Sequence, residues 1–113
     1  MELKFSKPMD DPEVLKRIAK DIHTTEGLLD KLDMWLRVLV ERALSEEKPD
    51  LNALLDEVLL SGKYDFYQAF IVVRALLKNN TFPSYSEHPQ FRTFVTETGK
   101  HARLINQTIW ENR

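Results

Sequence analysis

The feature that most constrains this chain is the segment 65–78, D-F-Y-Q-A-F-I-V-V-R-A-L-L-K, which is apolar on nearly every side. Phe66, Phe70 and Val73 recur at three- and four-residue steps, the period of one helix face, and the residues between them are mostly apolar too. A helix of this kind belongs in the middle of a helical bundle. It is too short to cross a bilayer, which takes about 20 residues. We therefore expect a central buried helix over 66–79.

The first part of the chain, over about 11–46, predicts a long helix. Asp11, Pro12 and Glu13 form a helix start, with a capping carboxylate, a proline in the first turn and an acid near the positive end of the helix dipole. The apolar seam that follows alternates three- and four-residue steps without a slip, through Leu15, Ile18, Ile22, Thr25, Leu29, Leu32, Leu36, Leu39 and Ala43. This pattern predicts one helix over about 11–46. The poor helix formers in 24–27 leave a bend or a break there as the alternative.

Two further helices and an N-terminal arm complete the predicted fold. Asp50 caps a helix that Gly62 ends, and Ser86 caps a last helix with Pro89 in its first turn. Residues 1–10 lead in as an extended arm whose apolar side chains pack on the bundle. We predict a single all-α domain over 1–113, a four-helix bundle with long first and last helices, two short middle helices and a short extended N-terminal arm. The expected helices are 11–46, 51–61, 66–79 and 87–111.

Each of the long helices carries a stretch of Thr and Gly at mid-length. Thr25 and Thr98 occupy seam positions, with Gly27 and Gly99 beside them. Small residues let two helix backbones approach closely, whereas large ones hold them about 8–10 Å apart. These stretches predict either a crossing of the first and last helices near Thr25 and Thr98 or simply a kink in each helix.

The composition argues against catalysis and secretion. The chain has no Cys, which removes disulfides, thiol nucleophiles and Cys-ligated zinc and is typical of a reducing compartment. Its start has no long apolar segment of the kind that forms a signal peptide. It also contains no Gly-x-Ser-x-Gly, phosphate-binding or dinucleotide-binding motif. We expect a cytoplasmic protein with no membrane association, no enzymatic activity and no cofactor.

Four side chains with metal-binding chemistry would come together if the long helices crossed as described. His23 and Glu26 lie three residues apart on the first helix, and Glu97 and His101 lie four apart on the last. Carboxylate-bridged metal sites in bundles use several carboxylates and the order Glu-x-x-His, which is reversed on the first helix. We therefore expect solvated side chains that flank a helix contact, with no metal.

Basic side chains on the first and last helices are candidate phosphate contacts. They are Lys16, Arg17, Lys20, Arg92, Lys100 and Arg103. A stripe of this kind could hold a nucleic-acid backbone. However, the net charge is −2, and Asp21, Asp30 and Asp33 interrupt the first group, which is typical of a solvated helix face. Contact with RNA or DNA is therefore the second functional hypothesis.

Aromatic side chains give the first functional hypothesis. Phe82 and Tyr85 fall in the loop before the last helix, and Trp110 lies in its last turn, where each is hard to bury. Tyr and Trp are enriched where protein partners dock. We take these three as candidate partner contacts and assign Trp35, in the apolar second half of the first long helix, to the core.

The length of the first helix points to association. At 1.5 Å per residue a helix over 11–46 is roughly 50 Å long, and the two short middle helices cannot cover it. Part of its seam, near Ile18 or near Trp35 and Val38, should therefore stay exposed in a lone chain and pair with another protein surface. A two-fold homodimer is the simplest such arrangement, with a different protein as the alternative. Ile18 and Val38 therefore join the candidate partner contacts.

These observations predict a non-enzymatic protein-interaction module: a small subunit of a larger assembly, an adaptor, or an inhibitor that binds a protein partner. The alternative is a helical subunit or regulator that contacts RNA or DNA through its basic helix faces. Steep salt dependence of binding would favour the alternative, because phosphate contacts release counterions.

Overall fold

The computed structural model describes residues 3–24, 26–45, 51–78 and 88–111. Within these segments the chain is all-α, as predicted, and contains no strand. Its elements are α1 (Pro12–Asp21), the 3-10 turn η1 (Leu29–Lys31), α2 (Met34–Ser45), α3 (Leu51–Leu60), α4 (Phe66–Lys78), α5 (Pro89–Lys100) and α6 (Ala102–Glu111). Helices α3 and α4 match the two short helices expected in the middle of the chain, whereas both long helices are divided.

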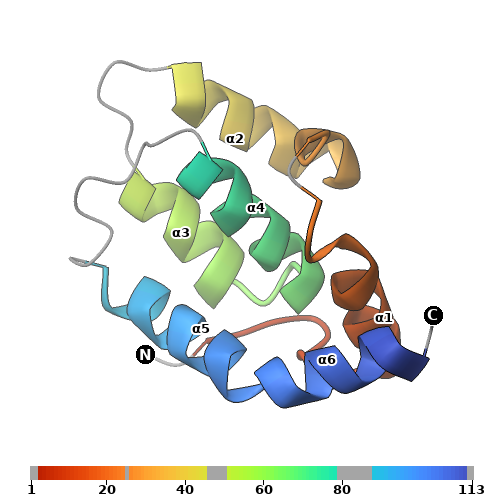
Figure 1. Ribbon diagram of the computed structural model, residues 1–113. Coiled ribbons are helices and arrows are strands. Elements are labelled where there is room, and N and C mark those ends of the chain that lie inside the picture. Colours follow the sequence, from red (N-terminus) through yellow and green to blue (C-terminus); the bar gives the residue numbers. More distant parts are fainter. Residues whose placement is uncertain (1–2, 25, 46–50, 79–87, 112–113) are drawn as a thin grey trace.

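Helix α4 lies at the centre of the molecule. It packs against α1, α3 and η1, and Figure 1 shows α5 and α6 along the side opposite α2. Oδ1 of Asp65 accepts a hydrogen bond from the Gln68 amide at 2.8 Å, which caps the start of the helix. Val73 and Leu76 are 5% and 0% exposed, so the predicted burial of this helix is confirmed.

The first long helix is divided after Asp21, so the prediction of a continuous helix over 11–46 is wrong. The chain turns through Gly27, whose φ of +66° lies in the left-handed region that favours glycine. Helix α2 then begins at a cap of its own, because Oδ1 of Asp33 accepts a hydrogen bond from the Leu36 amide at 2.9 Å. The break that the poor helix formers allowed is the arrangement observed.

Arg74 of α4 holds the end of α1 in place. Its guanidinium donates hydrogen bonds to the backbone carbonyls of Ile22 and Thr24, the second at 2.9 Å. Carbonyls at a helix end have no partner within the helix, and leaving them buried and unpaired is unfavourable. A side chain of the central helix therefore satisfies the backbone at the point where the chain turns.

The division keeps most of the seam in the core. Leu15 and Ile18 of α1, and Leu36 and Val40 of α2, are all at most 8% exposed. Helices α4 and α6 pack against α1 and cover its apolar side. Ile18 is 0% exposed, so its assignment as a partner contact is wrong and it belongs to the core.

The predicted helix over 87–111 is also divided, at His101, where α5 gives way to α6. The hydroxyl of Thr98 donates a hydrogen bond to the Phe94 carbonyl at 2.9 Å, a side-chain bond that often bends helices. Gly99 beside it is a poor helix former. The Thr and Gly stretch on this segment therefore marks a kink. The first and last segments contact each other where α1 packs against α6.

Helix α5 is capped by a buried histidine that no sequence pattern indicated. Nδ1 of His88 accepts a hydrogen bond from the Phe91 amide at 3.1 Å, and its Nε2 lies 2.9 Å from Oδ1 of Asp56 on α3. Because Nδ1 accepts, Nε2 carries the proton and donates to the carboxylate. The cap expected at Ser86 lies outside the described residues, as does Thr25 of the expected helix crossing.

The N-terminal arm packs between the α3–α4 connection and α5 (Figure 1). The amide of Lys4 donates a hydrogen bond to the Leu59 carbonyl at 2.8 Å, at the end of α3. The ring centroid of Phe5 lies 5.1 Å from that of Phe66 and 6.1 Å from that of Phe94. The arm thus ties α4 to α5 through an aromatic cluster, as expected of an extended arm whose apolar side chains pack on the bundle.

Truncation of Leu76 tests the central position of α4. Leu76→Ala leaves a cavity at a site that is 0% exposed, so we expect the free energy of unfolding to fall by about 2–5 kcal/mol. Urea denaturation measures this. Val95→Ala, at an exposed site on α5, is the control and should stay within about 0.5 kcal/mol of the parent. A Leu76→Ala variant as stable as the parent would contradict the burial of α4.

Two glycines form a matched pair for testing the break in the first segment. At Gly27 the positive φ is unfavourable for alanine, so Gly27→Ala should destabilise by about 1 kcal/mol. Gly99 lies within α5 and an added methyl group meets no atom within 4 Å, so Gly99→Ala should stabilise by up to about 1 kcal/mol. Thermal unfolding compares the two variants. If Gly27→Ala were the stabilising one, the continuous helix would be correct after all.

Candidate functional site

Exposed large apolar side chains gather on one side of α2. Met34, Trp35 and Val38 are 83%, 61% and 39% exposed, and they lie within the first two turns of the helix. Single exposed apolar residues are ordinary on protein surfaces, but neighbouring ones form a patch of the kind that partners cover. We refer to these three residues as the outer face of α2.

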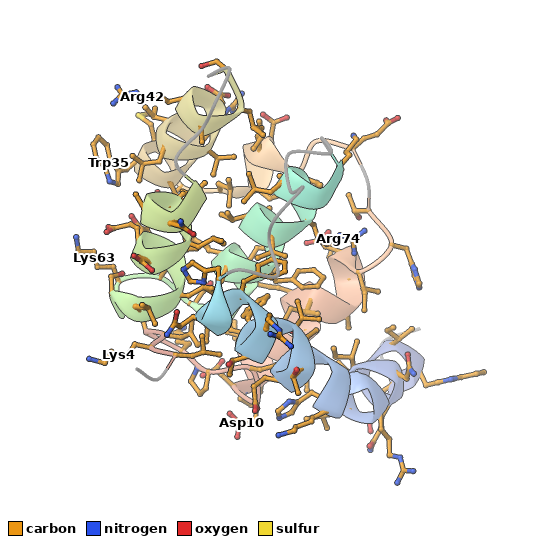
Figure 2. The ribbon with its side chains drawn as sticks, turned by 90° about the vertical axis from the view of Figure 1, so that its left-hand side faces the viewer. Lys4, Asp10, Trp35, Arg42, Lys63 and Arg74 are labelled. Carbon is orange, nitrogen blue, oxygen red and sulfur yellow. The ribbon has the colours of Figure 1, made fainter. Side chains whose placement is uncertain are left out.

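A groove of about 400 Å³ runs beside the outer face, between α2 and α3. It is lined by Trp35, Leu39, Arg42, Ala43, Ala53, Leu54, Glu57 and Lys63. Figure 2 shows Trp35, Arg42 and Lys63 on the same side of the molecule, with Trp35 projecting from α2. Trp35 belongs to both features, so the outer face and the groove form one continuous surface.

The charged groups around this surface differ in how they are paired. Nζ of Lys63 lies 3.2 Å from Oε1 of Glu57. Arg37, on the opposite flank of α2, contacts carboxylate oxygens of Asp30 at 2.8 Å and Glu41 at 2.9 Å. Arg42 is exposed, and no carboxylate of the described segments forms an ion pair with it. Its guanidinium is therefore the cation at the groove that remains available to a partner.

The structure separates the candidate partner contacts taken from the sequence. Val38 lies on the outer face of α2, and Trp110 is 70% exposed on α6. Phe82 and Tyr85 lie outside the described residues. The assignment of Trp35 to the core is wrong, because the segment M-W-L-R-V-L-V buries one side of α2 and exposes the other.

The six candidate phosphate contacts are all exposed and are distributed over α1, α5 and α6. Two of them already have partners. Arg17 stacks its guanidinium carbon 4.0 Å from the ring centroid of Tyr67 and lies 3.7 Å from a carboxylate oxygen of Asp65. Lys100 lies 3.3 Å from Oε1 of Glu97. The remaining four, Lys16, Lys20, Arg92 and Arg103, carry the nucleic-acid hypothesis.

The most buried acid in the described part of the chain is Asp21, at the end of α1. One carboxylate oxygen accepts a hydrogen bond from the Tyr67 hydroxyl at 2.7 Å, and the other lies 3.2 Å from Nζ of Lys31. Burial would raise the pKa of Asp21, but the bonds from Tyr67 and Lys31 hold it below its ordinary value. Burial and the bond to Asp21 raise the pKa of Tyr67 far above its usual range, so the hydroxyl stays a donor. Both oxygens of the acid are engaged, and the cluster is structural.

A second groove, of about 410 Å³, lies between the N-terminal arm and α5. It is lined by Phe5, Met9 and Phe66 among apolar residues, and by Asp10 and Glu97 among acidic ones. Asp10 points outward at its rim (Figure 2). None of the lining residues is an exposed large apolar side chain, so this groove is a weaker candidate than the surface on α2 and α3.

The candidate metal ligands do not form a site. His101 and Glu97 share a turn, with Nδ1 of the histidine 2.8 Å from the glutamate carbonyl oxygen. Among the described residues, no group of three or more His, Asp or Glu side chains is arranged to hold a metal ion. His23 and Glu26 were expected on a helix that crosses the segment carrying Glu97 and His101. They lie instead in the turn that follows α1.

No family model, no curated protein and no solved structure matches this chain. Across the described segments, no helix is both long enough and apolar enough to span a bilayer. The outer face of α2 and the adjoining groove are the features of the described surface that most resemble a binding site.

The pH dependence of stability tests the state of Asp21. Its folded pKa is below the unfolded value of about 3.9, so its contribution to stability is complete above that pH and is lost as the pH falls through the folded pKa. Asp21→Asn should therefore lower the free energy of unfolding by about 1–3 kcal/mol at pH 7, and the difference should shrink towards pH 3.

Urea denaturation at a series of pH values measures the difference. Asp10→Asn, at an exposed aspartate, is the matched control and should leave stability nearly unchanged at every pH. A penalty for Asp21→Asn that stays constant down to pH 3 would contradict the paired, ionised carboxylate.

Proposed function

We propose that this chain is a non-enzymatic protein-interaction module that binds its partner on the outer face of α2 and in the groove between α2 and α3. The observation that carries the proposal is the exposure of Met34, Trp35 and Val38 side by side, next to a groove with an apolar floor. Such a module acts as a subunit, an adaptor or an inhibitor, and none of these roles needs catalytic groups.

Trp35 is the expected anchor of the interface. The residue is 61% exposed, and covering that area is worth about 2–4 kcal/mol at roughly 25 cal/mol per Å². Tryptophan is also enriched among the residues that dominate binding energies. Leu39 and Leu54 line the groove beside it, so an apolar side chain of the partner would find contacts on two helices.

Charged groups at the edge of the groove supply specificity. Arg42, Glu57 and Lys63 surround the apolar floor, which matches the usual arrangement of a hydrophobic centre inside a polar rim. A partner is therefore expected to bring an apolar or aromatic side chain together with a group that complements Arg42.

The rival proposal is contact with RNA or DNA through Lys16, Lys20, Arg92 and Arg103, which are exposed on α1, α5 and α6. The two proposals differ in their response to salt. Binding through phosphates should weaken steeply between 50 and 200 mM salt, by roughly tenfold or more for several contacts. Binding through the outer face of α2 should change little over the same range.

Photocrosslinking in the native host tests the docking surface. We expect p-benzoylphenylalanine in place of Trp35 or Val38 to give discrete covalent adducts with protein after irradiation. The same amino acid in place of Val95, which is similarly exposed on α5, is the matched control and should give none of these adducts. The absence of adducts from both positions on α2, or the same adducts from position 95, would overturn the proposal.

A further inference from the structure

We infer that the partner on the outer face of α2 is a second copy of this chain, with the two α2 helices antiparallel across a two-fold axis between Val38 and Leu39. This inference rests on the proposed function and names the occupant of the same surface. It comes from the order of residues along α2, which is complementary to its own reverse.

Trp35 and Arg42 both line the groove and lie seven residues apart on one side of α2. At 1.5 Å per residue they are separated by about 10 Å along the helix, two turns apart. An antiparallel second copy reverses their order, so its Arg42 meets Trp35 while its Trp35 meets Arg42. A two-fold interface requires this reciprocity.

The two groups attract one another. A guanidinium over an indole face is a favourable cation–π contact, and tryptophan is the strongest aromatic partner for it. The chain forms this type of contact internally: the guanidinium carbon of Arg17 lies 4.0 Å from the Tyr67 ring centroid and that of Arg74 lies 5.4 Å from the Phe70 centroid. Arg42 is available for such a contact, whereas Arg37 on the same helix is held by Asp30 and Glu41.

The centre of the proposed interface is apolar. Val38 and Leu39 flank the axis, and Met34 extends the apolar area at each end. The two Arg42 side chains lie at opposite ends of the pair, so like charges do not face each other. The arrangement therefore buries apolar area in the middle and places one cation–π contact on each side.

The size of the exposed surface of α2 sets the expected affinity of the dimer. Helix α2 has 12 residues, about 18 Å of length, so the contact area falls short of the roughly 800 Å² per partner that a stable interface buries. The dimer is thus expected to be a weak one that forms reversibly at roughly micromolar concentrations.

Helix α6 provides an internal control. Trp110 and Arg103 are also exposed and also lie seven residues apart. Between them, however, Asn106 and Gln107 are exposed polar residues, so α6 has no apolar centre to bury. If the Trp–Arg spacing alone caused self-association, α6 would form a dimer interface as readily as α2. Substitutions on α6 therefore show whether the apolar centre of α2 is needed as well.

The test is sedimentation equilibrium of the full chain over a range of concentrations. The parent should convert from a 13.3 kDa species to one of twice that mass as concentration rises. Trp35→Arg places two arginines opposite each other at both ends, and Arg42→Glu places a carboxylate against the indole. Each variant alone should associate at least about tenfold more weakly than the parent.

An equimolar mixture of the Trp35→Arg and Arg42→Glu chains should recover the dimer. In the mixed pair the introduced arginine meets the introduced glutamate at one end, and the native cation–π contact remains at the other. Trp110→Arg and Arg103→Glu on α6 should leave association unchanged. Circular dichroism confirms that each variant is folded, which is expected because all four sites are exposed.

A monomer at every concentration, or a mixture that fails to recover the dimer, would overturn the self-pairing. If adducts with a different protein still formed from positions 35 and 38, the proposed function would stand and only its occupant would change. If those adducts were missing as well, both would fail.

Discussion

The course of the chain depends on two polar side chains of the central helix. Arg74 binds the carbonyls of Ile22 and Thr24, and Tyr67 donates its hydroxyl hydrogen to Asp21. Helix α4 is apolar on nearly every side, so burying the polar ends of Arg74 and Tyr67 costs free energy unless they are hydrogen-bonded. They pair with the end of α1, and in doing so they fix the point at which the chain turns towards α2.

That turn decides which surfaces are covered. Helix α1 keeps its apolar side against α4 and α6, while α2 packs mainly against α3 and η1. The inner side of α2 completes the core, and its outer face, Met34, Trp35 and Val38, remains exposed. The proposed docking surface is therefore a consequence of the break in the first segment, because α6 covers α1 and reaches no comparable contact with α2.

The two middle helices could be predicted from the sequence because each is an apolar run with a helical period, and Gly62 separates the two runs. The break between α1 and α2 could not be predicted in this way, because the seam of three- and four-residue steps continues across it and both helices face the same core. A periodic pattern does not distinguish one long helix from two helices in register. Gly27 and the cap at Asp33 were weak local signals, and the decisive bond comes from Arg74, far along the chain. The same limit applies to exposure: Val38 is exposed, and whether it contacts a partner stays a prediction. Trp35 is exposed as well but was assigned to the core, because burial on one side of a helix and burial on two sides give similar local patterns.

Amide hydrogen exchange by NMR across residues 15–45 tests the break most directly. We expect slow exchange in the second half of α1 and in α2, separated by fast exchange at residues 26–28, where the chain turns through Gly27. The α4 amides, in the centre of the core, should be the slowest to exchange. Slow exchange at 26–28 comparable to that of the flanking helices would show a continuous helix, and with it the exposed face of α2 and the docking surface built on it would have to be abandoned.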